Sequence, residues 1–186
     1  MKPETKPETN FFIGIDPGQS GAVAMINSRG DIVSLQDTPV IHIKQGKKNR
    51  TKYVESQMAT ILDNMRSSHS TGKLEAVIEA VHAMPAQGVT SMFSMGMGFG
   101  LWVGILAALR IPYRKVEPVV WKRAIGIVAG SSKNASIIRA QQAFPGVSFR
   151  KDKGRVDTLD GRADALLLAE YLRKASQLAD YLRKQL

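Results

Sequence analysis

The sequence predicts an α/β protein: a mixed five-stranded sheet, with three antiparallel strands first, flanked by helices. Two observations predict this architecture. Short apolar segments separated by turn residues open the ordered chain, and segments with helical periodicity then alternate with further apolar strands. The length of 186 residues suits one domain with a sizeable core. We therefore expect a flexible N-terminal arm over residues 1–10 and a single domain over residues 11–186.

Three short apolar segments follow the arm and are expected to be strands: Phe11–Asp16, Ala22–Asn27 and Ile32–Gln36. The linkers between them, PGQSG and SRGD, consist mostly of turn residues. A parallel crossover needs a dozen or more residues, so strands this close together in the chain pair antiparallel. The segment therefore predicts an antiparallel meander.

The remaining elements follow from periodicity and composition. A polar loop with five cations is expected over residues 42–52, a Gly- and Met-rich loop from His82 to Gly98, and a basic loop over residues 145–158. The expected helices and strands are, in chain order, helix Tyr53–Ser67, strand Leu74–Val81, helix Leu101–Arg110, strand Tyr113–Glu117, helices Trp121–Ile125 and Lys133–Phe144, and helix Leu159–Gln185. Helix Leu101–Arg110 is apolar on nearly every face, which predicts a central position.

The composition limits the classes of function. Lys and Arg number 26 against 16 Asp and Glu, and the net charge of +10 favours a polyanionic partner such as nucleic acid. Cysteine is absent, which excludes disulfides, Cys-ligated zinc, Fe–S clusters and a Cys nucleophile. The three histidines are too few and too scattered for a His-rich zinc site.

The first ten residues, MKPETKPETN, contain a tandem KPET repeat that cannot bury a core. They lack the cationic and apolar segments of a signal peptide, and their glutamates disfavour an organellar transit peptide. The longest nearby apolar run, Leu101–Leu109, is about half of the ~18 residues that span a bilayer. We expect a cytoplasmic protein of bacterial or phage type, with no membrane partner.

Four carboxylates stand where a charge needs compensation. Asp16 ends the first strand, and Glu79 lies inside the apolar strand VIEAV, where an unpaired charge is costly. Asp160 and Asp164 are four residues apart, which places them about 40° apart on one helix face and roughly 6 Å apart along its axis. Taken singly, Asp16 could be a turn former and Asp160 a helix N-cap.

Together these carboxylates suit a metal-dependent phosphodiesterase. Hard oxygen ligands select Mg²⁺ or Mn²⁺. Two such ions about 4 Å apart activate water and stabilise the leaving oxygen during in-line attack on a phosphodiester. We therefore expect the metal ligands and catalytic carboxylates to be Asp16, Glu79, Asp160 and Asp164.

Five motifs occur in a set order: GIDPGQSGAVA, IEAVHAMP, GMGFGLWVGIL, WKRAIG and DGRADALLLAEYL. In this order and at these separations they resemble the RuvC-type Holliday junction resolvases, most of all the plant chloroplast branch. The resemblance covers about residues 11–175. Each motif alone is weak, whereas the ordered combination is specific. The resemblance implies an RNase H-like fold, in agreement with the order of strands and helices expected above.

The resemblance also implies an activity and its residues. The family cleaves four-way DNA junctions by metal-dependent paired nicking and acts as a homodimer, with no small organic cofactor. Its acidic tetrad falls on Asp16, Glu79, Asp160 and Asp164. Lys133 matches a lysine near the scissile phosphate, where it could neutralise charge developing on the phosphoryl oxygens, although a solvated lysine in a first helical turn is the other interpretation. Lys122 matches a lysine expected to touch the DNA backbone, and Trp121 beside it suits the core.

Three groups of cations are candidates for contacts with DNA phosphates. Such contacts would give an affinity for DNA that falls steeply as the salt concentration rises. They are Lys44, Lys47, Lys48, Arg50 and Lys52; Lys122 and Arg123; and Arg150, Lys151, Lys153 and Arg155. Residues 84–99 contain four Met and two Phe among small residues. One interpretation is an apolar wedge, carried by Met92 and Phe93, that enters the open centre of a junction. The other is that Met95 and Phe99 pack under the following helix.

Two other interpretations of the whole chain stay open. One is a non-catalytic protein that binds branched DNA, although such a binder has no reason to place carboxylates against phosphate. Another is an RNase H-like nuclease that acts on a different branched or hybrid substrate. A phosphate-loop ATPase or sugar kinase would share the GIDPGQSGA turn, but it needs a second such domain, for which 186 residues are too few.

Overall fold

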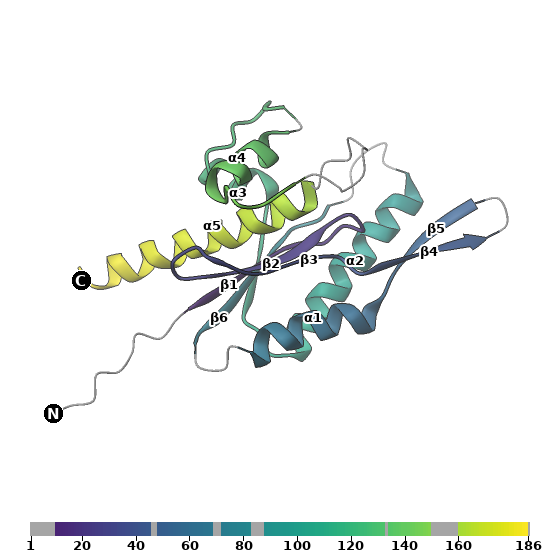
Figure 1. Cartoon of the computed structure of the whole chain (residues 1–186), viewed down its shortest axis with the longest axis horizontal. Coiled ribbons are helices and arrows are strands. Elements are labelled where there is room, and N and C mark those ends of the chain that lie inside the picture. Colours follow the sequence, from purple (N-terminus) through teal and green to yellow (C-terminus); the bar gives the residue numbers. More distant parts are fainter. Residues whose placement is uncertain are drawn as a thin grey trace.

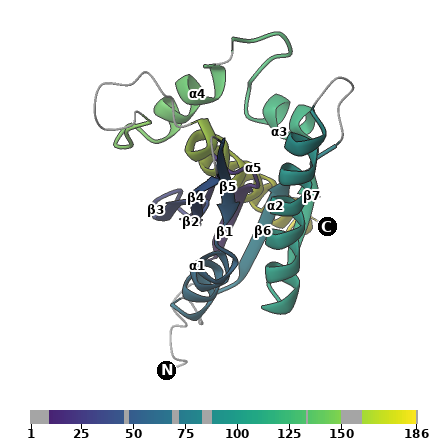
Figure 2. The same cartoon turned by 90° about the vertical axis from the view of Figure 1, so that its right-hand side faces the viewer.

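The computed structural model describes residues 10–45, 48–68, 72–82, 88–132, 134–149 and 160–185. Its centre is a five-stranded sheet with the strand order β3-β2-β1-β6-β7, whose strands are labelled in Figures 1 and 2. The strands are β1 (Phe11–Asp16), β2 (Ala22–Asn27), β3 (Ile32–Asp37), β6 (Leu74–Glu79) and β7 (Tyr113–Val116). The first three pair antiparallel, whereas β6 pairs parallel to β1 and β7 parallel to β6. The predicted mixed sheet with its opening meander is confirmed.

Helices cover both faces of this sheet (Figures 1 and 2). On one face α1 (Glu55–Ser67) and α2 (Val89–Ala108) bury the side chains that alternate along β1 as Ile13 and Ile15. On the other face α3 (Pro118–Ala124), α4 (Ala135–Ala143) and α5 (Asp160–Arg183) form a second core that includes Phe12 and Val77. The alternation of strand side chains thus supplies two cores, one on each side.

The closest approach of a helix to the sheet depends on one glycine in β1. A Cβ atom built on Gly14 would overlap the carbonyl oxygen of Ala165 and the amide nitrogen of Ala169 in α5. Only a residue without a side chain therefore lets α5 lie directly on the central strand. This contact fixes the depth of α5 against β1, and hence the place of the helix start relative to the end of the strand.

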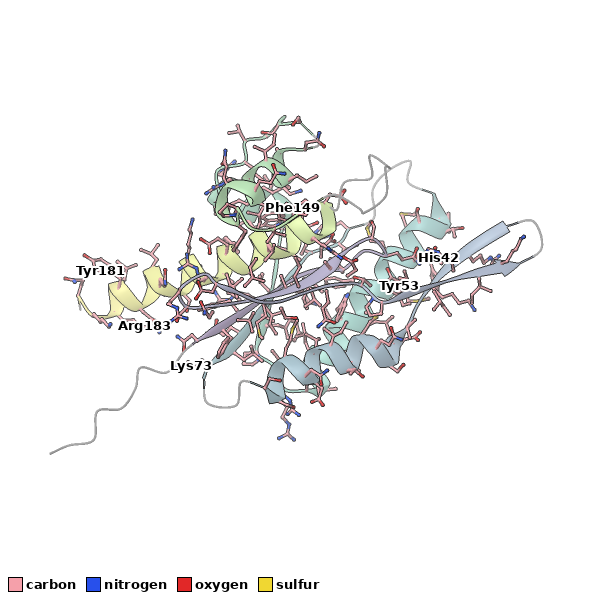
Figure 3. All side chains as sticks on the ribbon, viewed as in Figure 1. His42, Tyr53, Lys73, Phe149, Tyr181 and Arg183 are labelled. Atoms are coloured by element: carbon pink, nitrogen blue, oxygen red, sulfur yellow. The ribbon has the colours of Figure 1, made fainter. Side chains whose placement is uncertain are left out.

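The polar loop expected over residues 42–52 is wrong. That segment forms a two-stranded hairpin of β4 (Val40–Gln45) and β5 (Lys48–Tyr53), paired in register from Val40↔Tyr53 to Gln45↔Lys48. The two strands satisfy each other's backbone hydrogen bonds, so the segment needs no apolar cover on both faces. Figure 1 shows the hairpin extending from the domain, and in Figure 3 Tyr53 lies where the hairpin joins it.

The loop expected from His82 to Gly98 is also largely wrong, because α2 begins at Val89. Gly98, Trp102 and Leu106 are the buried residues of this helix, and its other apolar residues are partly buried or exposed, so the expectation of a central helix fails as well. A Cβ on Gly98 would overlap the Tyr53 hydroxyl and the Pro17 carbonyl, so glycine at this position lets α2 lie close to the end of β5 and to the turn after β1. By length and composition α2 could also cross a bilayer, a test that core helices pass too.

The other boundaries shift by a few residues. Strand β6 ends at Glu79, α3 begins at Pro118, and α5 runs from Asp160 to Arg183. Proline at the first position of α3 has no amide hydrogen to satisfy, which suits a helix start. The last turns of α5 reach past the sheet, so that Tyr181 and Arg183 lie at the far end from α3 and α4 (Figure 3).

Candidate active site

Asp16 and Glu79 lie at the same edge of the sheet, where the strands β1 and β6 end. They end the parallel neighbours β1 and β6, whose register pairs Ile15 with Ile78 one residue earlier. Side chains alternate along a strand, so both carboxylates point to the face opposite Ile15 and Ile78, which is the face covered by α5. The parallel pairing therefore brings together two acidic residues that are far apart in the chain.

The start of α5 brings the other two carboxylates to this edge. A Cβ on Gly161 would overlap the Ser20 carbonyl oxygen, so the first turn of α5 sits directly on the turn that follows β1. Arg162 ties the same turn to the end of β3, because its Nε and Nη2 donate to the two carboxylate oxygens of Asp37 at 2.6 and 2.8 Å. Asp160 and Asp164 are thereby held beside Asp16.

The charges in this cluster act on one another. Burial raises the pKa of Asp16 to about 7, helped first by the charge of Asp164 and then by that of Glu79, while the Gly18 amide that donates to Asp16 Oδ1 at 3.3 Å opposes the rise. Asp160 also raises the pKa of Asp16, by a smaller amount. A carboxylate whose pKa reaches neutrality marks a place where negative charge is concentrated and a cation would be stabilised.

The other buried carboxylates behave similarly. Burial raises the pKa of Glu79, against the hydrogen bond that Trp121 Nε1 donates to Glu79 Oε2 at 2.7 Å. Burial also raises the pKa of Asp164, against the nearby Ser136 hydroxyl and the Lys122 ammonium, whose Nζ lies 3.7 Å from Asp164 Oδ2. Asp164 Oδ1 is buried without a hydrogen-bond partner.

The donor set suits a hard divalent ion. The cluster offers oxygen ligands only, together with an excess of negative charge and one buried, unpartnered oxygen on Asp164. Across the described ranges, no three His, Asp or Glu side chains are yet arranged as ligands of a single ion. Mutual repulsion opposes a closer approach of these carboxylates, and a divalent cation would offset it. The fold thus gathers the four predicted ligands, and their role as ligands stays a prediction.

The proton on Asp16 predicts how stability depends on pH when metal is chelated. Between about pH 4 and pH 7 the folded protein keeps a proton that the unfolded chain has released, so the free energy of unfolding falls as the pH rises through this window. The fall from this group amounts to about 4 kcal/mol. Urea denaturation of the parent and Asp16→Asn in EDTA measures it. Asp16→Asn should lose this pH-dependent decrease in the free energy of unfolding, and a variant that keeps it contradicts the raised pKa of Asp16. Asp31→Asn is the control, because the pKa of Asp31 is lowered.

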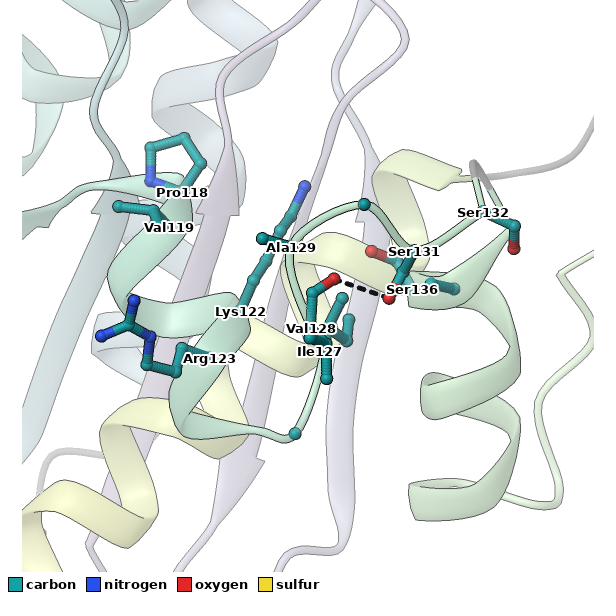
Figure 4. A pocket seen from close by; sticks show the side chains of 13 residues that line it. Pro118, Val119, Lys122, Arg123, Ile127, Val128, Ala129, Ser131, Ser132 and Ser136 are labelled. Atoms are coloured by element: carbon teal, nitrogen blue, oxygen red, sulfur yellow. Dashed lines mark hydrogen bonds between the residues drawn. The ribbon is translucent and has the colours of Figure 1, made fainter.

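A cleft of about 560 Å³ between α3 and α4 borders the acidic cluster. Lys122 and Ser136, which both act on Asp164, also line this cleft, together with Arg123 and the segment from Gly126 to Ser132. Figure 4 shows Lys122 and Arg123 leaving α3 in different directions, and the Ser131 hydroxyl that donates to the Val128 carbonyl at 2.6 Å. The cleft therefore offers cations and hydroxyls beside the carboxylates.

The predicted DNA-binding residues are only partly described. Lys122 is half-buried beside Asp164, and Arg123 is exposed at the cleft. Arg50 is exposed on β5, and Lys48 belongs to the same strand. Lys47, Lys133, Lys151 and Lys153 lie outside the described residues, as does the side chain of Lys48.

Met92 and Phe93 lie in the first turns of α2 and not in a loop. Met92 is half-buried, whereas Phe93 is 69% exposed. Of the residues expected to pack under the helix, Phe99 contacts the core, while Met95 is exposed. An apolar side chain is thus presented to solvent near the start of α2, as the wedge interpretation requires.

Several residues around the cluster were not predicted as part of it. Trp121, expected in the core, is buried there and also donates to Glu79. Tyr53 feels the charge of Asp16, since burial and that charge raise the pKa of its phenol, and its hydroxyl donates to the Ser94 carbonyl at 3.1 Å. His82, after β6, contacts both carboxylate oxygens of Glu117, after β7, at 2.8 Å. Neighbouring parallel strands end at one edge of a sheet, so the positions of His82 after β6 and Glu117 after β7 are the signal that could have indicated this last pair.

Comparison with known proteins finds a relative in sequence over about half of the chain. No family model matches the chain. It is 28% identical over 100 residues to the chloroplastic Holliday junction resolvase MOC1 of Chlamydomonas reinhardtii. The match covers 53% of this chain and only 11% of that protein, so the chain spans a small part of the length of its relative.

Solved structures share the fold over nearly the whole chain. Thermus thermophilus RuvC matches with a TM-score of 0.52 at 13% identity, covering 90% of this chain and 96% of RuvC. The same protein in complex with a Holliday junction substrate matches with a TM-score of 0.54 at 11% identity, covering 91% and 96%. The yeast mitochondrial Holliday junction resolvase Ydc2 matches with a TM-score of 0.55 at 14% identity, covering 96% and 84%. The chain therefore has the mixed α/β, RNase H-like fold of the Holliday junction resolvases RuvC and Ydc2.

Proposed function

We propose that this protein is a structure-selective DNA endonuclease that resolves four-way junctions by paired nicks. The observation that carries the proposal is the cluster of Asp16, Glu79 and Asp164, whose pKa values are raised by burial and, to a smaller extent, by neighbouring carboxylates, at one edge of a resolvase fold. A cleft with cationic side chains borders the cluster, and the net charge of the protein is +10. These positive charges would attract a phosphate backbone to the place where the carboxylates lie.

The carboxylates Asp16, Glu79, Asp160 and Asp164 would hold Mg²⁺, or Mn²⁺. When bound, the metal supplies an activated water and neutralises charge on the phosphate oxygens. Lys122 would compensate negative charge that develops on the phosphate, because its ammonium lies beside the cluster, 3.7 Å from Asp164 Oδ2. The hydroxyls and cations of the α3–α4 cleft would orient the cleaved strand, and Lys133, just before α4, would add a further positive charge.

The hairpin is the second DNA-contacting element of this proposal. Cross-strand pairs share a face, so Ile41, Ile43, Arg50 and Lys52 form one exposed face of β4 and β5. A two-stranded ribbon of this size fits the major groove, and the two cations suit the phosphates at its rim. The hairpin is tied to the turn that follows Asp16, because Gln19 Nε2 donates to the Thr51 carbonyl at 2.9 Å.

Replacing both hairpin cations should weaken junction binding and reduce its salt dependence. For Arg50→Ala/Lys52→Ala we expect the slope of log K against log salt to become shallower by about 1 for each phosphate that the variant no longer neutralises. Fluorescence anisotropy over a salt series measures the slope. Arg29→Ala is the matched control. Arg29 lies in the turn between β2 and β3 and pairs with Asp31, so its replacement should leave the slope unchanged. An unchanged slope in the hairpin variant would remove the hairpin from the DNA interface.

The proposal also covers assembly and the junction centre. Paired nicking requires two active sites, and the exposed side of α2, with Val89, Phe93 and Met97, offers an apolar surface for a second copy or for unstacked bases. Phe93 is the candidate wedge, since its ring is exposed near the helix start. The chain is thus expected to act as a homodimer on four-way junction DNA.

The test of the function is direct. A labelled mobile four-way junction is incubated with and without Mg²⁺, beside a linear duplex and an RNA–DNA hybrid of matched sequence. Symmetric nicks in the junction alone, and only with metal, support the proposal. Comparable cutting of the hybrid favours an RNase H-like nuclease of other specificity, and tight junction binding without cutting in Mg²⁺ or Mn²⁺ favours a non-catalytic binder.

A further inference from the structure

We propose that Trp121 is a positioning residue of the acidic cluster, holding the Glu79 carboxylate by its indole N–H so that one oxygen is kept for a divalent ion. The proposal rests on the function proposed above. Trp121 is fully buried, and its Nε1 lies 2.7 Å from Glu79 Oε2, a bond between α3 and β6 across 42 residues of sequence.

The second tryptophan shows that this bond is not a requirement of burial. Trp102 is also fully buried, in the core on the opposite face of the sheet, and its Nε1 has no hydrogen-bond partner. A buried indole in this protein can therefore leave its N–H unpaired. The bond of Trp121 to Glu79 is a specific contact with the cluster.

The chemistry of the bond explains what it would do. An indole N–H is a donor only, and a hydrogen bond to a charged carboxylate is short and strong. Binding Oε2 fixes the rotation of the carboxyl group and leaves Oε1 for an ion. Partners of this kind behind a metal ligand commonly change metal affinity by about 10- to 100-fold.

The neighbouring residue gives the same helix a second hold on the cluster. Lys122 follows Trp121 in α3 and reaches Asp164 on α5. Consecutive residues of one short helix thus contact ligands from β6 and α5. Helix α3 therefore bridges Glu79 and Asp164, and the burial of Trp121 in the core fixes the position of α3 itself.

The experiment compares two Trp→Phe variants by metal binding without DNA. Mg²⁺ is titrated while the thermal midpoint is followed, and the half-maximal concentration is read for the parent, Trp121→Phe and Trp102→Phe. We expect that concentration to rise about tenfold in Trp121→Phe and to stay unchanged in Trp102→Phe. In a Glu79→Gln background, Trp121→Phe should add nothing further. In cleavage assays the single variant Trp121→Phe should need more Mg²⁺ than the parent, while its cleavage rate at saturating Mg²⁺ stays near the parent's.

A second measurement needs no change at Trp121. The chain has two tryptophans, so the NMR spectrum of Trp102→Phe assigns the indole N–H resonances of both. Addition of Mg²⁺ to the parent should shift the Trp121 resonance and leave that of Trp102 in place. Equal Mg²⁺ affinity of parent and Trp121→Phe, or an unresponsive Trp121 resonance in a protein that Mg²⁺ does stabilise, overturns the proposal. If Mg²⁺ does not stabilise the parent either, the metal site of the proposed function has failed instead.

Discussion

Asp16→Asn is expected to lower the rate of junction cleavage at least about a hundredfold while junction binding is kept or tightened. The substitution keeps the shape of the side chain and removes a charge from the centre of the cluster, where burial and the charges of Asp164 and Glu79 raise the pKa of this carboxyl to about 7. Loss of that charge weakens the attraction for a divalent ion. It also removes a negative group from the path of the DNA phosphates, which is why binding should not suffer.

The measurement combines single-turnover cleavage of a labelled four-way junction with a binding titration of the same DNA in Ca²⁺. Asp164→Asn should behave similarly, since Asp164 is buried in the same cluster. Asp63→Asn, an exposed aspartate paired with Arg66 on α1, is the matched control and should cleave normally. Parental nicking by Asp16→Asn would show that the chemistry lies elsewhere in the molecule.

Gly14→Ala should destabilise the fold by about 3 kcal/mol or more. The added methyl group would meet backbone atoms of Ala165 and Ala169, which cannot rotate away as the end of a flexible side chain could. Either α5 moves off β1 or the strand shifts, and both movements open the core on that face of the sheet. Because α5 carries Asp160 and Asp164, cleavage should fall even at temperatures where the variant remains folded.

Urea denaturation followed by circular dichroism gives the free energy of unfolding. Gly146→Ala is the matched control, because a methyl group there meets no atom within 4 Å, and its effect should stay within about 0.5 kcal/mol. A Gly14→Ala variant as stable as the control would mean that α5 does not lie on β1 as described.

The sheet could be predicted because its signals are local. Short linkers between β1, β2 and β3 force antiparallel pairing, and an apolar run interrupted by glutamates marks β6. The carboxylates at the ends of β1 and β6 could be paired in advance, since each interrupts or ends an apolar strand. Their gathering by α5 follows from the resemblance and from the spacing of Asp160 and Asp164 on one helix face.

Two elements escaped prediction for opposite physical reasons. The hairpin is rich in lysine and arginine, and its alternation of Ile41 and Ile43 with polar residues was outweighed by those charges. The first half of α2 contains glycine, serine, valine and threonine, so its local helix propensity is low despite its methionines. Its helix is stabilised by tertiary contacts, such as Gly98 against Tyr53. The bond of Trp121 to Glu79 has no local signal, because it links separate elements across the cluster.

The placement of Asp16 on the first strand and Asp164 on the last helix has a consequence during synthesis. A nascent chain that has left the ribosome only as far as β7 already has the sheet residues Asp16 and Glu79, but it lacks α5. The proposed metal site therefore cannot form before α5 is made. The order of elements along the chain thus means that the cluster of four carboxylates is complete only after α5 has been synthesised and has packed on the sheet.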